Sequence, residues 1–284
     1  VVDPKTNTTT RIPLMARDAD TPSSADQPPA APSPYWADET IWNSKTTVHS
    51  FAMDKQGRVW AAARIRKSET PAWCRAGSDH PSAKLLPITQ SGRGLIVYDP
   101  KTKKQTTIDT CFSWGHVNFD DNDVLWSSFG PAGVEGWFDV KVWDKTHDEK
   151  ASQGWSAFVL DYNGNGKRDA YTEPGQPDDP TKDKRIAGGF YGVAPSPLDG
   201  SVWGSVLGMP GGVIRVAPGP DPTNTALSEY YEVPWNNAKS PAQGFAPRGM
   251  DVDSKGVVYL VMRAPVAKGP SYRVCGCGPL THGG

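Results

Sequence analysis

The sequence lacks any long hydrophobic run. Its longest apolar stretch, residues 257–262, is too short to cross a bilayer as a helix. It also lacks an excess of charge of either sign, because 30 Lys and Arg residues balance 31 Asp and Glu residues among 284. A protein that neutralises a phosphate backbone needs a basic surplus. These two absences exclude a membrane span and nucleic-acid binding from the expected classes.

Several catalytic signatures are absent as well. The sequence contains no nucleophile elbow, phosphate-binding loop, dinucleotide fingerprint or Cys-x-x-Cys-His haem motif. What is plentiful is Gly, with 29 residues, and Pro, with 27, which leaves little room for long helices. The apolar fraction of 37% is sufficient for a core, and the 11 Trp need packed surface around them. Composition therefore favours a folded protein with few long helices.

One hairpin pattern occurs four times. Each copy has an apolar stretch, a tight turn containing Asp, and an apolar pair that ends in an aromatic residue. The copies are residues 51–60, 117–126, 193–203 and 250–259. Asp, Asn and Gly tolerate the positive φ that hairpin turns require. Each copy therefore predicts two antiparallel strands, which we call a and b.

A second pattern follows the first and predicts strands c and d. The pairs of segments are 95–102 with 107–108, 140–146 with 155–160, and 213–216 with 230–233. Four-stranded antiparallel units in series are typical of a β-propeller, here with about four blades. The alternative is a β-sandwich in which the turns recur by coincidence.

The repeats divide the chain into a propeller at 1–263 and a Gly-rich tail at 264–284, which holds Cys275 and Cys277 and is left unassigned. Within the propeller we expect strands c and d of a split or truncated blade at 1–14, with strand d at 11–14, followed by a Pro-rich connection at 15–48. Complete blades are expected at 49–111, 116–160 and 191–235, with an insertion at 161–190. Strands a and b of a last blade are expected at 248–263. The chain starts within a strand pattern and without Met, so we expect a fragment or a processed product. Either its two ends close a four-bladed ring, or, as we favour, missing blades or a partner chain complete a larger one.

The hairpins, together with the Tyr-Asp-Pro-x-Thr pattern that ends at Thr102, resemble the streptogramin-lyase-like (virginiamycin B lyase-like, NHL-like) β-propellers. Residues 42–261 are also similar to secreted proteobacterial propeller proteins of unassigned function. The resemblance implies the propeller fold and, as one activity, metal-assisted lyase chemistry that uses His and Glu. That His and Glu set has no residue-by-residue counterpart in this sequence.

The remaining cysteines predict a disulfide. Cys74 and Cys111 have no His at zinc-ligand spacing, and a bridge between them would place the protein outside the cytoplasm, in the periplasm or secreted. Two free, buried thiols are the alternative.

Residues 161–169 follow the first nine positions of an EF-hand-type calcium loop, with Gly166 at the sharp turn. The twelfth position is Thr172, and a carboxylate comes one residue later. The expected Ca²⁺ ligands are Asp161, Asn163, Asn165, the Lys167 carbonyl, Asp169 and Glu173. An Asn- and Gly-rich turn without a metal is the alternative.

Four polar residues align at the start of strand a in successive repeats: His49, His116, Tyr191 and Arg248. The long connections 15–48, 64–93 and 161–190 fall on the same rim of the predicted propeller, and such loops carry function. Two His residues can bind a second divalent metal in the central channel or exchange protons, and Arg can hold an anion. Hydrogen-bonded structural side chains are the alternative.

Two functions remain open from the sequence. The first is an extracytoplasmic, calcium-binding propeller whose loop-rich face binds a small-molecule or polymeric ligand. The second is a metal-assisted lyase or lactone hydrolase with its catalytic residues at the channel.

Overall fold

The computed structural model of the chain describes residues 1–21, 45–128, 133–264 and 271–275. Most of this part is β-structure. The helices within it are short: a 3-10 turn at Ala72–Cys74, α1 (Pro81–Leu85), α2 (Val140–Thr146) and α3 (Pro222–Thr225). The expected all-β class is confirmed.

The first two large sheets are antiparallel meanders. One has the order β3-β4-β5-β6, with β3 (Val48–Met53), β4 (Val59–Ala63), β5 (Gly94–Asp99) and β6 (Lys104–Ile108). The next has the order β7-β8-β9-β10, with β7 (Asn118–Phe119), β8 (Val124–Ser127), β9 (Val134–Asp139) and β10 (Gln153–Ala157). We call them sheets 1 and 2.

Sheet 3 repeats the same order and then continues beyond it. Its four antiparallel strands are β14 (Val193–Pro195), β15 (Val202–Val206), β16 (Gly212–Ala217) and β17 (Leu227–Glu232). Three short strands of the 161–190 region and its approach extend it past β17: β11 (Val159–Leu160), β13 (Asp183–Arg185) and β12 (Tyr171–Thr172). Because β11 follows β10 directly, the chain passes from sheet 2 to sheet 3 at this point.

Sheet 4 consists of β18 (Met250–Val252), β19 (Val258–Ala264) and β20 (Ser271–Cys275), and a separate hairpin, β1 (Val2–Asp3) with β2 (Thr8–Thr9), precedes sheet 1. Strand β20 lies within the segment that the sequence left unassigned.

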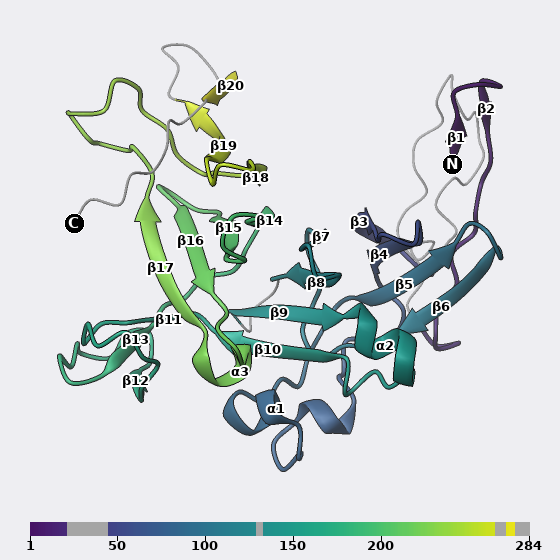
Figure 1. Cartoon of the computed structure of the whole chain (residues 1–284), viewed down its shortest axis with the longest axis horizontal. Coiled ribbons are helices and arrows are strands. Elements are labelled where there is room, and N and C mark those ends of the chain that lie inside the picture. Colours follow the sequence, from purple (N-terminus) through teal and green to yellow (C-terminus); the bar gives the residue numbers. More distant parts are fainter. Residues whose placement is uncertain (22–44, 129–132, 265–270, 276–284) are drawn as a thin grey trace.

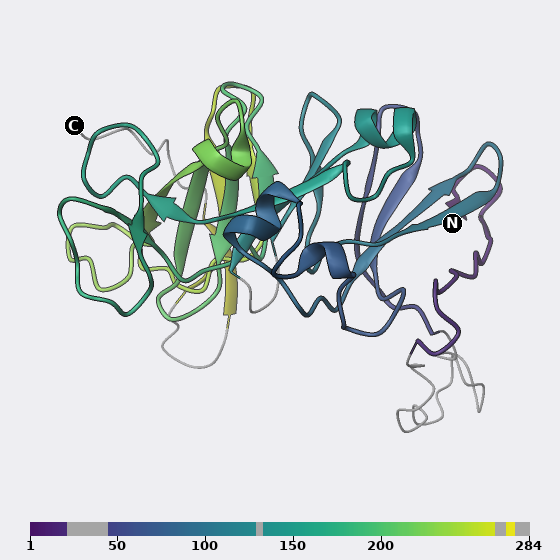
Figure 2. The same cartoon turned by 90° about the horizontal axis from the view of Figure 1, so that it is seen from below.

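The four sheets follow one another in chain order, and their first strands contact each other in turn: β3 with β7, β7 with β14, and β14 with β18. Figure 1 shows them in an arc whose two ends are the β1–β2 hairpin and β18–β20. Seen from below, sheets 1, 2 and 3 follow one another along the length of the molecule, and sheet 4 overlaps sheet 3 in this view (Figure 2). The residues that lead into these first strands are therefore brought together.

Aromatic side chains fill the spaces between successive sheets. Trp60, Phe112 and Phe138 belong to the cluster of sheets 1 and 2, whereas Phe190 belongs to that of sheets 2 and 3. Two of these rings lie directly against glycine residues. A Cβ at Gly136 would lie 2.2 Å from the Phe112 ring, and one at Gly204 would lie 1.7 Å from Phe190. The two rings can lie this close to strands β9 and β15 because Gly136 and Gly204 have no side chain.

Two predicted strands are wrong. Residues 140–146, expected as a c strand, form α2, because the Asp139 side chain accepts the backbone N–H groups of Lys141 and Val142 and so caps a helix. Strand c of this repeat is β9, immediately before it. Residues 11–14, expected as a d strand, are not a strand; β2 pairs with β1 instead, and the segment runs beside sheet 1, where Gln105 Nε2 donates to the Pro13 carbonyl at 2.7 Å.

Within the described residues, no helix combines the length and the apolar character that a bilayer crossing requires.

Candidate functional site

The four aligned polar residues meet at one place, which we call the rim cluster: His49, His116, Tyr191 and Arg248. The imidazoles of His49 and His116 contact edge to face with centroids 5.2 Å apart. The His116 ring lies 4.6 Å from the Tyr191 ring, and the Arg248 guanidinium lies 5.2 Å above the Tyr191 ring. Four side chains from four successive sheets thus form one continuous line.

Hydrogen bonds from strand b of the same or the preceding repeat hold the backbone of three of these residues, His116, Tyr191 and Arg248. Tyr191 N–H donates to the Ser205 carbonyl at 2.7 Å, and Arg248 N–H donates to the Val261 carbonyl at 2.9 Å. The hydroxyl of Ser127 donates to the His116 carbonyl at 2.7 Å, and that of Ser205 to the Arg248 carbonyl. His49 differs slightly from the expectation, since it lies inside β3 rather than before it.

Burial and nearby positive charge favour the neutral form of the two imidazoles of the rim cluster. Partial burial, the charge of Arg93 and the presence of His116 lower the pKa of His49, and burial lowers the pKa of His116. A neutral imidazole carries one donor and one acceptor nitrogen, so each ring can hydrogen-bond a ligand or exchange a proton.

Arg248 ends the line with an unsatisfied donor. Its Nε is buried and has no hydrogen-bond partner, and the guanidinium takes part in none of the ion pairs of the described residues. An unpaired buried donor is costly, and a guanidinium presents a planar fork of N–H groups that matches a carboxylate or phosphate. This end of the rim cluster is therefore suited to an anion.

The rim cluster offers few ligands for a metal ion. Its two imidazoles are joined by no carboxylate or thiol, since the described part of the chain holds no group of three or more His, Cys, Asp or Glu that could bind a metal ion. Protein zinc sites use three or four such ligands. The second divalent metal stays a prediction.

The 161–169 loop gathers its side chains around Asp169. The amides of Asn163 and Asn165 both donate to Asp169 Oδ2, at 3.0 and 2.5 Å, which lowers the pKa of that carboxyl. Asp161 accepts the backbone N–H groups of Asn165 at 3.1 Å and Gly166 at 2.8 Å, and Gly166 has φ +73°. The amide oxygens of Asn163 and Asn165 accept the backbone N–H groups of Asn165 and Lys167. Amide and carboxylate oxygens are the ligand type that Ca²⁺ prefers.

The carboxylates beyond the loop differ in their contacts. Glu173, an expected ligand, forms an ion pair with Arg185, with Oε2 3.0 Å from Nη1. Asp183 is fully buried, and its Oδ2 accepts the backbone N–H of Asp169 at 2.7 Å, while its Oδ1 has no hydrogen-bond partner. Sequence reasoning missed Asp183, because nothing local marks a residue of another strand as the support of Asp169.

A second buried carboxylate, also missed, lies behind this loop. Glu135 is 1% exposed, and neither of its carboxylate oxygens has a hydrogen-bond partner. Burial raises its pKa to about 8, partly opposed by the charge of Arg168. Arg168 itself donates to the Ser156 hydroxyl and, at 3.3 Å, to the Ala226 carbonyl. One residue of the loop thus reaches the interior between sheets 2 and 3.

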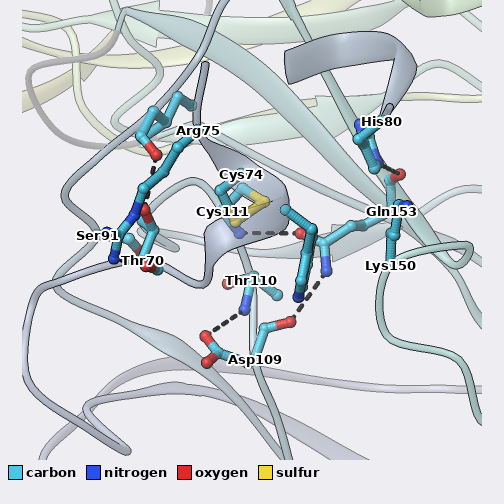
Figure 3. Close-up of a disulfide and its surroundings, with 12 residues drawn as sticks. Thr70, Cys74, Arg75, His80, Ser91, Asp109, Thr110, Cys111, Lys150 and Gln153 are labelled. Atoms are coloured by element: carbon cyan, nitrogen blue, oxygen red, sulfur yellow. Dashed lines mark hydrogen bonds between the residues drawn. A yellow bond between two sulfur atoms is a disulfide. The ribbon is translucent and has the colours of Figure 1, made fainter. Parts of the chain in front are cut away.

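The predicted disulfide between Cys74 and Cys111 is present and joins the β4–β5 connection to the segment that follows β6. Figure 3 shows Gln153 beside it. Cys111 N–H donates to Gln153 Oε1 at 2.9 Å, and Gln153 Nε2 donates to the Asp109 carbonyl at 2.9 Å (Figure 3). Cys277 lies outside the described residues, as does the side chain of Cys275.

No protein-family model matches the chain, and no curated protein matches it. Several solved structures are similar in part, of which three serve as examples. One is a provisionally assigned 6-phosphogluconolactonase from Bacteroides uniformis, with 12% identity and a TM-score of 0.39 over 79% of this chain and 55% of its own. A glucose dehydrogenase has 16% identity and a TM-score of 0.33 over 75% and 60%.

The third is the extracellular domain of a provisionally assigned one-component system from B. thetaiotaomicron, with 12% identity and a TM-score of 0.19 over 80% of this chain and 24% of its own. The chain spans little more than half the length of the first two structures. Likenesses of this strength carry no assignment of activity.

Proposed function

We propose that this protein is an extracytoplasmic, propeller-type binding module and that the rim cluster binds an anionic ligand. The observation that carries the proposal is the continuous line of His49, His116, Tyr191 and Arg248, which ends on the unpartnered Arg248 Nε. Two observations support the propeller. The four rim-cluster residues occupy equivalent positions in four successive repeats, and the first strands of the antiparallel sheets contact one another in chain order. The disulfide supports the extracytoplasmic location.

The rim cluster suits an anion chemically. Arg248 provides a charged, bidentate donor, and stacking on Tyr191 holds its plane in position. The neutral His116 ring beside Tyr191 provides one further N–H donor. Aromatic rings along the rest of the line offer apolar surface to the body of an organic ligand.

The experiment is titration of the protein with hexanoate, followed by the His116 ring resonances in NMR and by calorimetry at low ionic strength. We expect saturable binding that Arg248→Gln weakens at least tenfold. Lys239→Gln, which removes a positive charge from an exposed position outside the rim cluster, is the matched control. Equal affinities of wild type and Arg248→Gln contradict the proposal.

A metal-assisted lyase or lactone hydrolase is the second candidate. The observation in its favour is the contact of two neutral imidazoles, His49 and His116, because such a pair can act as acid and base or bind a metal. Metal analysis of protein purified without chelator separates the two functions. An equimolar divalent metal that is lost in His49→Ala and His116→Ala supports the enzyme.

We further propose that residues 161–169 bind Ca²⁺ as a structural ion. The support is the convergence of Asn163 and Asn165 on Asp169, together with the two N–H groups that fix Asp161. The backbone carbonyl of Lys167 would complete this side of the coordination shell.

A further inference from the structure

We propose that the ligand of the rim cluster is an elongated dianion, held by Arg248 at one end and by Arg93 at the other. This inference rests on the proposed function. Arg93 precedes β5 of sheet 1, and its Nη1 donates to the Trp114 carbonyl at 3.3 Å. Trp114 stands two residues before His116, so the Arg93 guanidinium lies beside the segment that leads into the rim cluster from the side opposite Arg248.

The positive charge at this end is concentrated. Arg93 is close enough to His49 for its charge to help lower the pKa of that imidazole. Burial and the charge of Arg64 lower the pKa of Arg93 itself. The backbone places Arg64 there, because its N–H donates to the Thr47 carbonyl at 3.2 Å. Like charges held together in a partly buried place attract an anionic group.

The middle of the line is aromatic rather than charged. Between the two guanidinium ends lie the rings of His49, His116 and Tyr191, whose successive centroids are 5.2 and 4.6 Å apart. Rings of this kind contact apolar or ring-shaped groups. The arrangement therefore fits a molecule that carries an acidic group at each end and an apolar or ring-shaped body between them. A single carboxylate would reach only one end.

The test is a series of α,ω-dicarboxylates from succinate to suberate, each compared with the monocarboxylate of the same chain length, by calorimetry at low ionic strength. We expect the best dicarboxylate to bind at least tenfold more tightly than its monocarboxylate. Arg93→Gln should remove that advantage and leave the monocarboxylate affinity within about twofold, whereas Arg248→Gln should weaken both. Arg93→Lys, which keeps the charge, should retain part of the advantage.

The outcomes separate the two proposals. Equal affinity for mono- and dicarboxylates at every length overturns the dianion, while the effect of Arg248→Gln still supports an anion site. If Arg93→Gln weakens both ligand types equally and circular dichroism shows an intact fold, Arg93 does not hold a second acidic group, and the inference is wrong. Binding of neither class, or an Arg248→Gln variant that binds like wild type, overturns the anion site and the dianion together.

Discussion

The indole of Trp60 donates a hydrogen bond to Asp54 Oδ2 at 2.8 Å, and the other oxygen of the same carboxylate accepts the backbone N–H groups of Gln56 and Arg58. One carboxylate thus closes the turn and anchors the aromatic residue of strand b. Asp120 does the same for Trp126, at 3.0 Å. The recurrence of Asp and an aromatic residue in these two repeats therefore has a common physical cause, whereas in the third repeat the indole of Trp203 donates to the Ser201 hydroxyl at 2.9 Å instead.

We expect Asp54→Ala to lower the free energy of unfolding by about 3 kcal/mol, because several donors around a residue that is 6% exposed lose their partner. Asp253→Ala should cost much less than Asp54→Ala, since its aromatic partner, Tyr259, is exposed and can hydrogen-bond to water instead. Urea unfolding measures both. Asp121→Ala, at an exposed turn position, is the control, and equal losses at all three positions would show that the carboxylate anchors nothing.

Calcium should raise the melting temperature, and a chelator should lower it, because an ion that binds only the folded state stabilises that state by mass action. Asp161→Ala should abolish this response. Glu173→Gln should retain it, since Arg185 already holds the Glu173 carboxylate. Thermal unfolding of the three proteins with and without Ca²⁺ is the measurement. Identical melting of wild type in calcium and in chelator would mean that residues 161–169 form a turn only.

Glu135 should make the protein less stable as the pH rises. Its pKa is about 8 in the folded chain against an ordinary value of 4.5, so between these pH values the folded carboxyl keeps a proton that the unfolded one has lost. Its contribution is complete below pH 4.5 and is lost towards pH 8, at about 1.4 kcal/mol for each pH unit.

Glu135→Gln cannot titrate at this position, so its stability relative to wild type should increase steadily from pH 5 to pH 8. Urea unfolding at a series of pH values gives the difference, and the titration of all other groups cancels in it. A difference that stays constant with pH would place the carboxyl in contact with water.

Removal of the Cys74–Cys111 disulfide should reduce the free energy of unfolding by about 4 kcal/mol, since the bridge closes a loop with a sequence separation of 37. The double variant Cys74→Ser with Cys111→Ser, compared with wild type in the absence of reductant, is the measurement. If reductant destabilises this double variant as much as it does wild type, the effect arises from the other cysteines.

The features that could be predicted from the sequence are those that a short stretch of residues determines. The turn carboxylates and strand-end aromatics identify the hairpins, and the position of His49, His116, Tyr191 and Arg248 within the repeat was sufficient to bring them together. The alternating Val140 and Val142 suggested a strand, but the Asp139 cap and the burial of Val140 and Trp143 on one helical face decide otherwise. No local pattern indicates that Glu135 is buried near the charge of Arg168, because Arg168 belongs to the 161–169 loop, which is distant in the sequence.

The position of the disulfide has a mechanical consequence. Strands β5 and β6 lie between Cys74 and Cys111, so tension applied to the two ends of the chain passes through the sulfur atoms and bypasses both strands. With the bridge closed, a sequence separation of 37, or about 120 Å of contour at about 3.4 Å per residue, cannot be extended by pulling. Reduction of the disulfide makes this length of chain extensible, and strands β5 and β6 then bear the applied force as the rest of the chain does.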